Sequence, residues 1–106
     1  MDSELPLQAI RRFVAERDWG QFHTPSNLAK SISIEAAELL ELFQWTDAIS
    51  PAEVVDELAD VITYCLLMAD RLGVDPNEIV LEKLKRTAIK YPVESSRGKS
   101  EKYDRL

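Results

Sequence analysis

The chain has 106 residues, of which 45% are hydrophobic and 30% charged, and only three are glycines. This length fits one small domain, and the composition is that of a soluble globular protein rich in helix. A net charge of −6 argues against nucleic acid as the main partner, and the single cysteine, Cys65, excludes an intrachain disulfide framework. The N-terminus is acidic and no apolar stretch is long enough to span a bilayer, so we expect a cytoplasmic protein that does not bind membranes.

The first half of the chain is predicted to form two helices. Apolar periodicity predicts a helix from residue 5 to about residue 19. Residues 18–23 break this pattern, and Thr24-Pro25-Ser26 is typical of a helix start. The second helix is expected to continue to about Trp45.

The second half is predicted to form two more helices and a tail. Ser50-Pro51-Ala52-Glu53 matches a capping box at the start of a third helix, and Gly73 is a plausible residue to end it. Asp75-Pro76-Asn77-Glu78 repeats the capping pattern before a fourth helix that reaches about residue 90. Residues 93–106 are polar without apolar periodicity, so we expect a tail that is ordered only if it docks.

These elements predict an all-α fold, a protomer resembling a four-helix bundle. Residues 58–68 of the third helix are apolar nearly all round, which indicates a central position or a subunit interface. Four helices in so short a chain bury a modest core. We therefore expect a homo-oligomer built through the second and third helices.

Two pairs of carboxylates are the most informative motif. Glu35 with Glu38, and Glu57 with Asp60, have i,i+3 spacing, which places each pair on one helix face. Apolar residues share these faces, so the acids would turn inward, repel one another and lose hydration. A divalent cation held by carboxylates relieves both penalties. Such a pair often lies on a solvated face instead, so spacing alone leaves both readings open.

An all-oxygen ligand set favours Mg2+, with Mn2+ as a substitute. Zinc prefers Cys and His, and the chain has one of each, far apart in sequence. A di-iron bundle requires Glu-x-x-His on two helices, whereas the second members here are Glu38 and Asp60. Because Mg2+ completes its shell with water and substrate phosphates, a metal site would indicate phosphate chemistry.

Further ordered motifs surround both acidic pairs and continue into the tail. They are Arg17-Asp18-Trp19-x-Gln21-Phe22-His23-x-Pro25-x-Asn27-Leu28, Glu35-x-x-Glu38-Leu39-x-Glu41-Leu42-Phe43-Gln44-Trp45, Glu57-Leu58-x-Asp60-Val61-x-x-Tyr64, Lys90-Tyr91-Pro92-Val93, Ser96-Arg97-Gly98 and Lys102-Tyr103. Together they closely resemble the MazG-type nucleotide pyrophosphohydrolases, and most closely the dCTP pyrophosphatase branch.

The resemblance implies an all-helical homo-oligomer, a dimer or commonly a tetramer. It divides the chain into a MazG-like domain, residues 1–92, and a polar tail, residues 93–106, that can dock on the nucleotide site. The implied reaction is Mg2+-dependent hydrolysis of a nucleoside triphosphate, such as dCTP or a related or modified dNTP, to the monophosphate and diphosphate. This activity would clean the nucleotide pool.

The resemblance also assigns roles to the acids. The four that would hold the metal are Glu35, Glu38, Glu57 and Asp60. A carboxylate not fully occupied by metal could orient or deprotonate the attacking water. Glu38 is the first candidate for this role, and Glu41, one turn further on, is the alternative.

Four aromatic or imidazole side chains fall at family positions that line the nucleotide pocket: Trp19, His23, Trp45 and Tyr64. Trp19 and Trp45 each close a predicted helix beside a loop, where a cleft could open. Tyr64 lies one turn past Asp60 on the same face, so it can border the metal site.

The polar candidates for substrate contact lie in the second half of the chain. Lys83, Arg97 and Lys102 are candidates for phosphate binding. Thr87 occupies the position, four residues before Tyr91-Pro92, where the family typically has Asn. Thr has one hydroxyl where Asn offers both an acceptor and an amide donor, so the base preference stays open.

Two alternatives remain. One is related chemistry on dUTP or phosphoribosyl-ATP. The other is a non-catalytic, acidic helical module for oligomerisation or regulation. The sequence also leaves open the number of metal ions and whether a neighbouring subunit completes each site.

Overall fold

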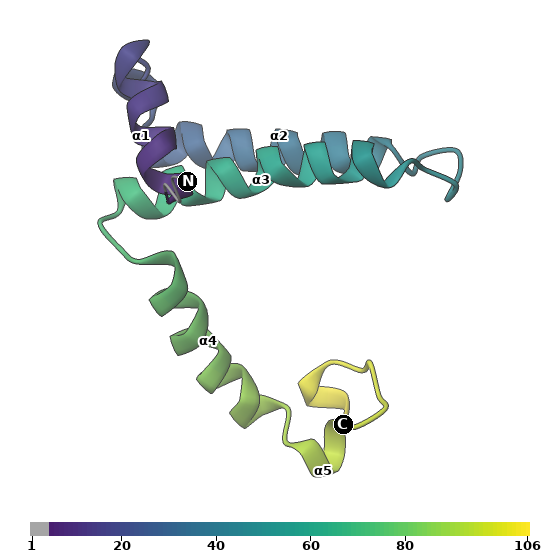
Figure 1. Ribbon diagram of the computed structural model, residues 1–106. Helices are drawn as coiled ribbons and strands as arrows, with labels where there is room; N and C mark the ends of the chain where they lie inside the picture. Colours follow the sequence, from purple (N-terminus) through teal and green to yellow (C-terminus); the bar gives the residue numbers. More distant parts are fainter. Residues whose placement is uncertain (1–4) are drawn as a thin grey trace. The chain divides into compact units, whose positions relative to one another are not determined.

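The structure, a computed structural model, describes residues 5–106, and all the regular secondary structure in that range is helical (Figure 1). The all-α prediction is therefore confirmed. Residues 1–4, the acidic N-terminus named in the sequence-based prediction of location, lie outside the described residues. The chain divides into two compact units, unit 1 ending at Gly73 and unit 2 spanning Val74–Leu106.

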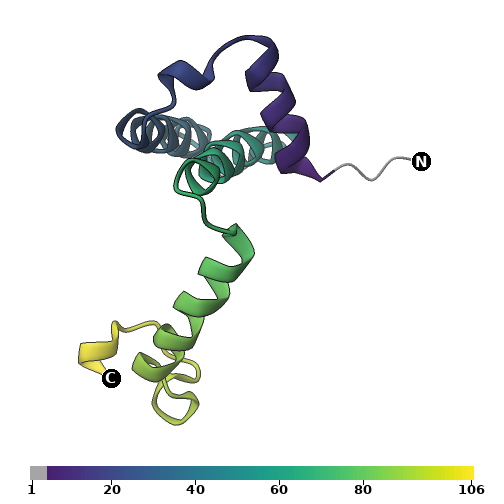
Figure 2. The ribbon, with the colours of Figure 1, turned by 90° about the vertical axis from the view of Figure 1, so that its left-hand side faces the viewer.

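Unit 1 contains α1 (Pro6–Glu16), the 3-10 helix η1 (Gly20–Phe22), α2 (Pro25–Glu41) and α3 (Pro51–Arg71). The two long helices, α2 and α3, run antiparallel and pack along their length, while α1 contacts α3 at one end of this pair (Figure 1). Figure 2 shows η1 within the arc that joins α1 to α2.

The turn after α1 brings Trp19 back toward that helix. Sequence periodicity predicts a helix to about Trp19, but α1 ends at Glu16. Asp18 adopts a φ of 53°, in the left-handed region that stops a helix. The backbone N–H of Trp19 donates to the carbonyl oxygen of Val14 at 3.1 Å, and the Trp19 and Phe13 ring centroids lie 5.5 Å apart. This turn therefore creates an aromatic corner that helix periodicity does not predict.

The start of α2 is fixed by two short-range hydrogen bonds. The Thr24 hydroxyl accepts from the backbone N–H of Asn27 at 3.1 Å, which confirms the predicted helix start. The Asn27 amide donates to the carbonyl oxygen of Phe22 at 2.9 Å and so ties η1 to the first turn of α2. At its other end α2 stops at Glu41, so Trp45 lies in the connection to α3 and not in the helix.

The two predicted capping boxes differ. Within residues 5–106, the Ser50 side chain accepts no capping hydrogen bond, so the capping box predicted for α3 is wrong. The Ser50 carbonyl oxygen instead accepts a hydrogen bond from the backbone N–H of Glu53 at 3.1 Å, and the fixed φ of Pro51 favours the first helical turn. Asp75 does cap its helix, since Oδ1 accepts from the N–H of Asn77 at 2.8 Å.

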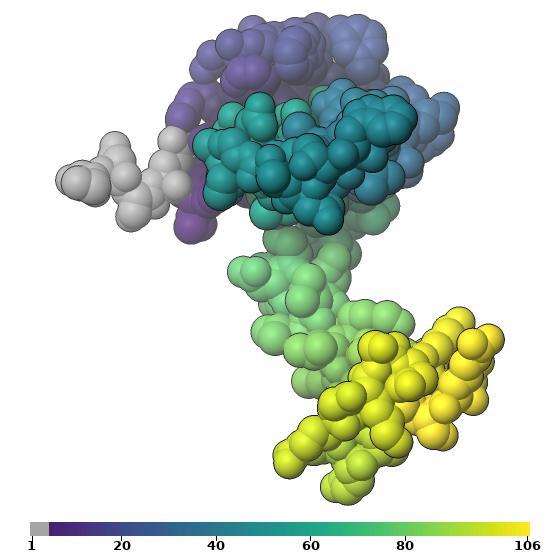
Figure 3. All heavy atoms as spheres, turned by 90° about the vertical axis from the view of Figure 1, so that its right-hand side faces the viewer, coloured from purple at the N-terminus to yellow at the C-terminus, as the bar shows by residue number. Residues whose placement is uncertain are grey.

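Unit 2 contains α4 (Pro76–Lys90), the short helix α5 (Val93–Ser96) and the 3-10 helix η2 (Tyr103–Arg105). Of these three elements, sequence patterns predict only α4. The backbone N–H of Tyr103 donates to the Tyr91 hydroxyl at 3.1 Å, and the two rings meet edge to face. Figure 3 shows the C-terminal segment gathered against the end of α4. Docking of this segment on a nucleotide site stays a prediction.

The core is small. Of the described residues, only Leu28, Leu67 and Ala69 are buried. Helix α3 is the central helix of unit 1, because it contacts both α1 and α2. Leu58 and Ile62 in its middle are exposed, so the alternative of a subunit interface there stays a prediction. No helix within residues 5–106 is long and apolar enough to cross a membrane. The cytoplasmic location stays a prediction.

Candidate functional site

The packing of α2 against α3 joins the two acidic pairs. Glu35, Glu57 and Asp60 each place a carboxylate oxygen within 4.8 Å of the others. Glu38 is not one of these three carboxylates, but its side chain is among the causes that raise the pKa values of Glu35 and Glu57. We call Glu35, Glu38, Glu57 and Asp60 the acidic cluster. The i,i+3 spacing aligns each pair on its own helix, and the antiparallel packing brings the two pairs face to face.

Proximity and partial burial oppose ionisation of Glu35 and Glu57. The hydrogen bond with Glu38 is the main cause that raises the pKa of Glu35 to about 7, and desolvation and the neighbouring negative charges add to it. Desolvation is the first cause that raises the pKa of Glu57, followed by the charge of Glu38. Acids on a fully solvated helix face would not be perturbed in this way, so Glu35 and Glu57 differ from ordinary surface acids.

The cluster also fits a hard cation. Oε2 of Glu35 and Oε2 of Glu57 are buried, and neither has a hydrogen-bond partner within residues 5–106. A buried acceptor without a partner costs free energy, and a bound cation would satisfy it. The donor set consists of carboxylate oxygens alone, which suits Mg2+ or Mn2+ and does not suit zinc.

A pocket of about 430 Å³ adjoins the cluster in unit 1. Its volume lies within the roughly 300–1,000 Å³ typical of small-molecule sites. The lining residues come from α1, from the turn through η1 and from α3: Ala9, Ile10, Phe13, Val14, Trp19, His23, Asp60, Thr63, Tyr64 and Leu67. Asp60 belongs to both the pocket and the acidic cluster. Three predicted nucleotide contacts, Trp19, His23 and Tyr64, therefore meet beside a candidate metal ligand.

Phe13 and Arg17 complete the aromatic corner of this pocket. The Phe13 and Trp19 rings meet at 74°, edge to face. The Arg17 guanidinium lies 3.7 Å from the centroid of the Phe13 ring and donates to the Phe13 carbonyl oxygen at 3.0 Å. Sequence patterns do not identify Phe13 as a pocket residue, because a pocket wall and a core-facing helix stripe have the same periodicity. The motif Arg17-Asp18-Trp19, which follows Phe13 closely in the chain, is the sequence feature that could have indicated its role.

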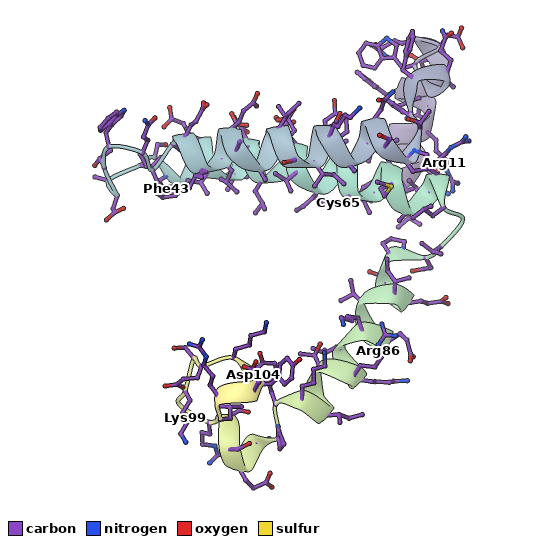
Figure 4. The ribbon with its side chains drawn as sticks, turned by 180° about the vertical axis from the view of Figure 1, so that it is seen from behind. Arg11, Phe43, Cys65, Arg86, Lys99 and Asp104 are labelled. Atoms are coloured by element: carbon purple, nitrogen blue, oxygen red, sulfur yellow. The ribbon has the colours of Figure 1, made fainter. Side chains whose placement is uncertain are left out.

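Two other predicted site residues of unit 1, Trp45 and Glu41, neither line this pocket nor belong to the acidic cluster. Trp45 is 87% exposed in the connection between α2 and α3. Figure 4 shows Phe43, near the start of that connection, at the opposite end of unit 1 from Arg11. Glu41, at the end of α2, is exposed and is not one of the three carboxylates grouped within 4.8 Å. Both positions stay predictions.

The remaining candidates belong to unit 2. Lys83 and Thr87 lie on α4, Arg97 follows α5, and Lys102 precedes η2. The Thr87 hydroxyl donates to the carbonyl oxygen of Lys83 at 3.0 Å. Its proton is therefore engaged by its own helix, which leaves acceptor lone pairs for any other partner.

Sequence comparisons identify relatives over nearly the whole chain. A model of the MazG-like family matches residues 30–106. The chain is 40% identical to dCTP pyrophosphatase 1 of Mus musculus, over 97% of this chain and 69% of that protein. It is 42% identical to dCTP pyrophosphatase 1 of Bos taurus, over 98% of this chain and 70% of the relative.

Structure comparison gives the same result. The crystal structure of a pyrophosphatase from Archaeoglobus fulgidus DSM 4304 superposes with a TM-score of 0.74 and 43% sequence identity. The match covers 81% of this chain and 88% of that one. The helical fold, the family match and the similarity to these relatives agree, and the chain belongs to the MazG-like family.

Proposed function

We propose that this MazG-like nucleotide pyrophosphatase hydrolyses dCTP or a related deoxynucleoside triphosphate to the monophosphate and diphosphate, and that it requires Mg2+. The observation that carries the proposal is the double role of Asp60, in the acidic cluster and in the wall of the pocket. A triphosphate has the same two-part character, with an anionic chain that needs a cation and a base that needs an apolar wall. The dCTP pyrophosphatase relatives support this substrate class.

The metal would be held by the acidic cluster. Its ligands would be Glu35, Glu38, Glu57 and Asp60, with Mn2+ as a substitute for Mg2+. When bound, the cation polarises phosphate oxygens and offsets the negative charge that develops as the anhydride bond breaks.

Glu38 is the best-placed residue to handle the attacking water. It is exposed, and its side chain is among the causes that raise the pKa values of Glu35 and Glu57, so it adjoins both the cluster and solvent. A carboxylate in this position can orient water and accept its proton. Glu41, also exposed at the end of α2, is the alternative.

The pocket would bind the base. Trp19 and Tyr64 offer aromatic faces for stacking, and His23 offers a polar edge. Lys83, Arg97 and Lys102 are proposed phosphate contacts. Because the Thr87 hydroxyl donates to its own helix, we expect weaker selection between bases than an amide at this position would provide.

We also propose that the protein acts as a homo-oligomer, a dimer or a tetramer, built through α2 and α3. Val55, Leu58 and Ile62 lie on one face of α3 and are all exposed in the protomer. A second copy covering this face would enlarge the small core, and it could bring Trp45 to a neighbouring pocket. Sedimentation should give a mass of two or four chains. Leu58→Glu should reduce it, and a monomeric wild type would contradict the proposal.

A substrate panel tests the activity. Diphosphate release is measured with Mg2+ and the canonical and modified dNTPs, with dUTP and phosphoribosyl-ATP included to test related chemistry. We expect dCTP or a related dNTP to have the highest kcat/KM and Glu38→Gln to abolish turnover. Glu53→Gln, which changes an exposed acid in the first turn of α3, is the matched control.

Two results would overturn the proposal. One is the absence of turnover with every triphosphate. The other is a melting temperature that Mg2+ with a non-hydrolysable nucleotide leaves unchanged, which would favour a non-catalytic helical module.

A further inference from the structure

A bidentate ion pair joins α1 to α3 across 59 residues of sequence. Nε of Arg11 donates to both Oδ1 and Oδ2 of Asp70 at 3.1 Å, and Nη2 of Arg11 also donates to Oδ1. Figure 4 shows Arg11 beside the C-terminal end of α3. The planar guanidinium fork fixes the relative orientation of two groups more strictly than a single contact does.

The ion pair lies next to the two walls of the candidate nucleotide pocket. Arg11 directly follows Ile10, a lining residue of the α1 wall, and Asp70 lies one helical turn beyond Leu67 of the α3 wall. Arg11 and Asp70 also line an adjoining pocket of about 420 Å³, and His23 lines both this pocket and the first. The ion pair therefore joins the two pocket walls close to the pocket itself.

The apolar packing of α1 fixes the position of this helix less strictly than the ion pair does. No residue of α1 is buried, so its apolar contacts with α3 are partly open to water. Such contacts are non-directional and tolerate sliding. The Arg11 hydrogen bond is the main cause that lowers the pKa of Asp70, so the carboxylate stays ionised across the neutral range and the link is present there.

The side chains of Arg11 and Asp70 are 56% and 28% exposed. An exposed pair contributes little to global stability, because water solvates both partners when they separate. Its larger effect is on orientation.

We propose that the Arg11–Asp70 ion pair is a positioning element that sets the distance between α1 and α3, and thereby the affinity of the pocket for the nucleotide. It does not touch the reacting atoms. The inference rests on the proposed function for the identity of the ligand.

The kinetic test is a double-mutant cycle of Arg11→Gln and Asp70→Asn. Each single variant should raise KM about threefold to tenfold, the loss expected for one charge-assisted contact, and leave kcat within about twofold. The double variant should be no worse than the weaker-binding single variant, because both changes break one contact. Glu82→Gln, which removes the exposed 3.7 Å ion pair with Lys85 on α4, is the matched control and should change neither constant.

A spectroscopic measurement tests the position of α1 without substrate. In a Trp45→Phe background, Trp19 is the sole tryptophan. Asp70→Asn should shift its emission to the red and increase quenching by acrylamide, because α1 carries one side of the aromatic corner. Arg11→Lys keeps the charge but loses the fork, and should give a smaller shift.

Three outcomes would overturn the inference. The first is a KM of the double variant equal to the product of the two single-variant effects, the second is a fall in kcat at constant KM in the single variants, and the third is unchanged Trp19 emission in Asp70→Asn. If the wild type hydrolyses no triphosphate, the proposed function fails, and the Trp19 spectra still decide whether the ion pair positions α1.

Discussion

The acidic cluster and the pocket share Asp60 but are built in opposite ways. The cluster lies between α2 and α3, which pack along their whole length, and its side chains are carboxylates. The pocket is largely apolar and lies where α1 meets one end of α3, with Trp19 and His23 supplied by a turn. The groups proposed for chemistry therefore lie on two helices that pack extensively against each other. Those proposed for recognition lie mainly where α1 and the turn after it pack less extensively. Mutations in the two regions should affect different kinetic constants.

The largest expected effect comes from a cluster ligand. Glu57→Gln should lower kcat/KM by about a hundredfold to a thousandfold, because it removes part of a cation site worth several kcal/mol in the transition state. The same change should raise the melting temperature without metal, since it removes a partly buried charge from among like charges. Activity and thermal melts in EDTA measure the two effects.

The control for this prediction is Glu53→Gln, one helical turn earlier on α3. It should change neither quantity appreciably. If Glu57→Gln lowered both activity and metal-free stability, the carboxylate would be supporting the fold and not a metal site.

The next effect concerns the pocket. Trp19→Ala should raise KM about tenfold with little change in kcat, because stacking of a base on an aromatic ring contributes about 1–3 kcal/mol. Steady-state kinetics with the best substrate of the panel measure this. Trp19→Phe keeps a ring and should lose less. A fall in kcat as large as that of Glu57→Gln would remove the division between the two regions.

Trp45 sharpens the same comparison. It lies outside the pocket of its own protomer. If a neighbouring subunit supplies Trp45, then Trp45→Ala should raise KM by up to about tenfold and Leu58→Glu should raise it too. An unchanged KM in Trp45→Ala would indicate that the pocket of one protomer is sufficient.

Binding of Mg2+ should stabilise unit 1 through the cluster. At a Mg2+ concentration ten times Kd, linkage contributes about 1.4 kcal/mol, which raises the melting temperature of a domain this size by several degrees. Glu35→Gln should reduce this shift, whereas Glu53→Gln should retain it. An equal shift in all three proteins would mean that Mg2+ acts elsewhere.

The smallest effect is the pH dependence of stability without metal. The folded-state pKa of Glu35 is raised from 4.5 to about 7, so the folded protein binds more protons than the unfolded chain in this interval. Stability from this group is then present below about 4.5 and is lost as the pH rises through about 7. The melting temperature of Glu35→Gln in EDTA should exceed that of wild type by a margin that grows over this interval. A margin that shrinks would contradict the raised pKa.

The sequence by itself determined the features that depend on near neighbours. The i,i+3 acidic pairs, the caps by Thr24 and Asp75, and the stop of α3 two residues before Gly73, whose φ is 70°, follow from helix geometry and local hydrogen bonds. Local rules also have limits. Ser50 fits the capping-box pattern without capping, and α1 stops before Trp19 because the chain turns at Asp18.

Only the tertiary structure decided which distant residues meet. It brings the two acidic pairs into one cluster, makes Asp60 common to the cluster and the pocket, and gives Phe13 a place in the pocket wall. It also joins Arg11 to Asp70. No spacing in the chain encodes these contacts, because each depends on how two helices pack, and packing is set by the sum of many weak contacts along both surfaces.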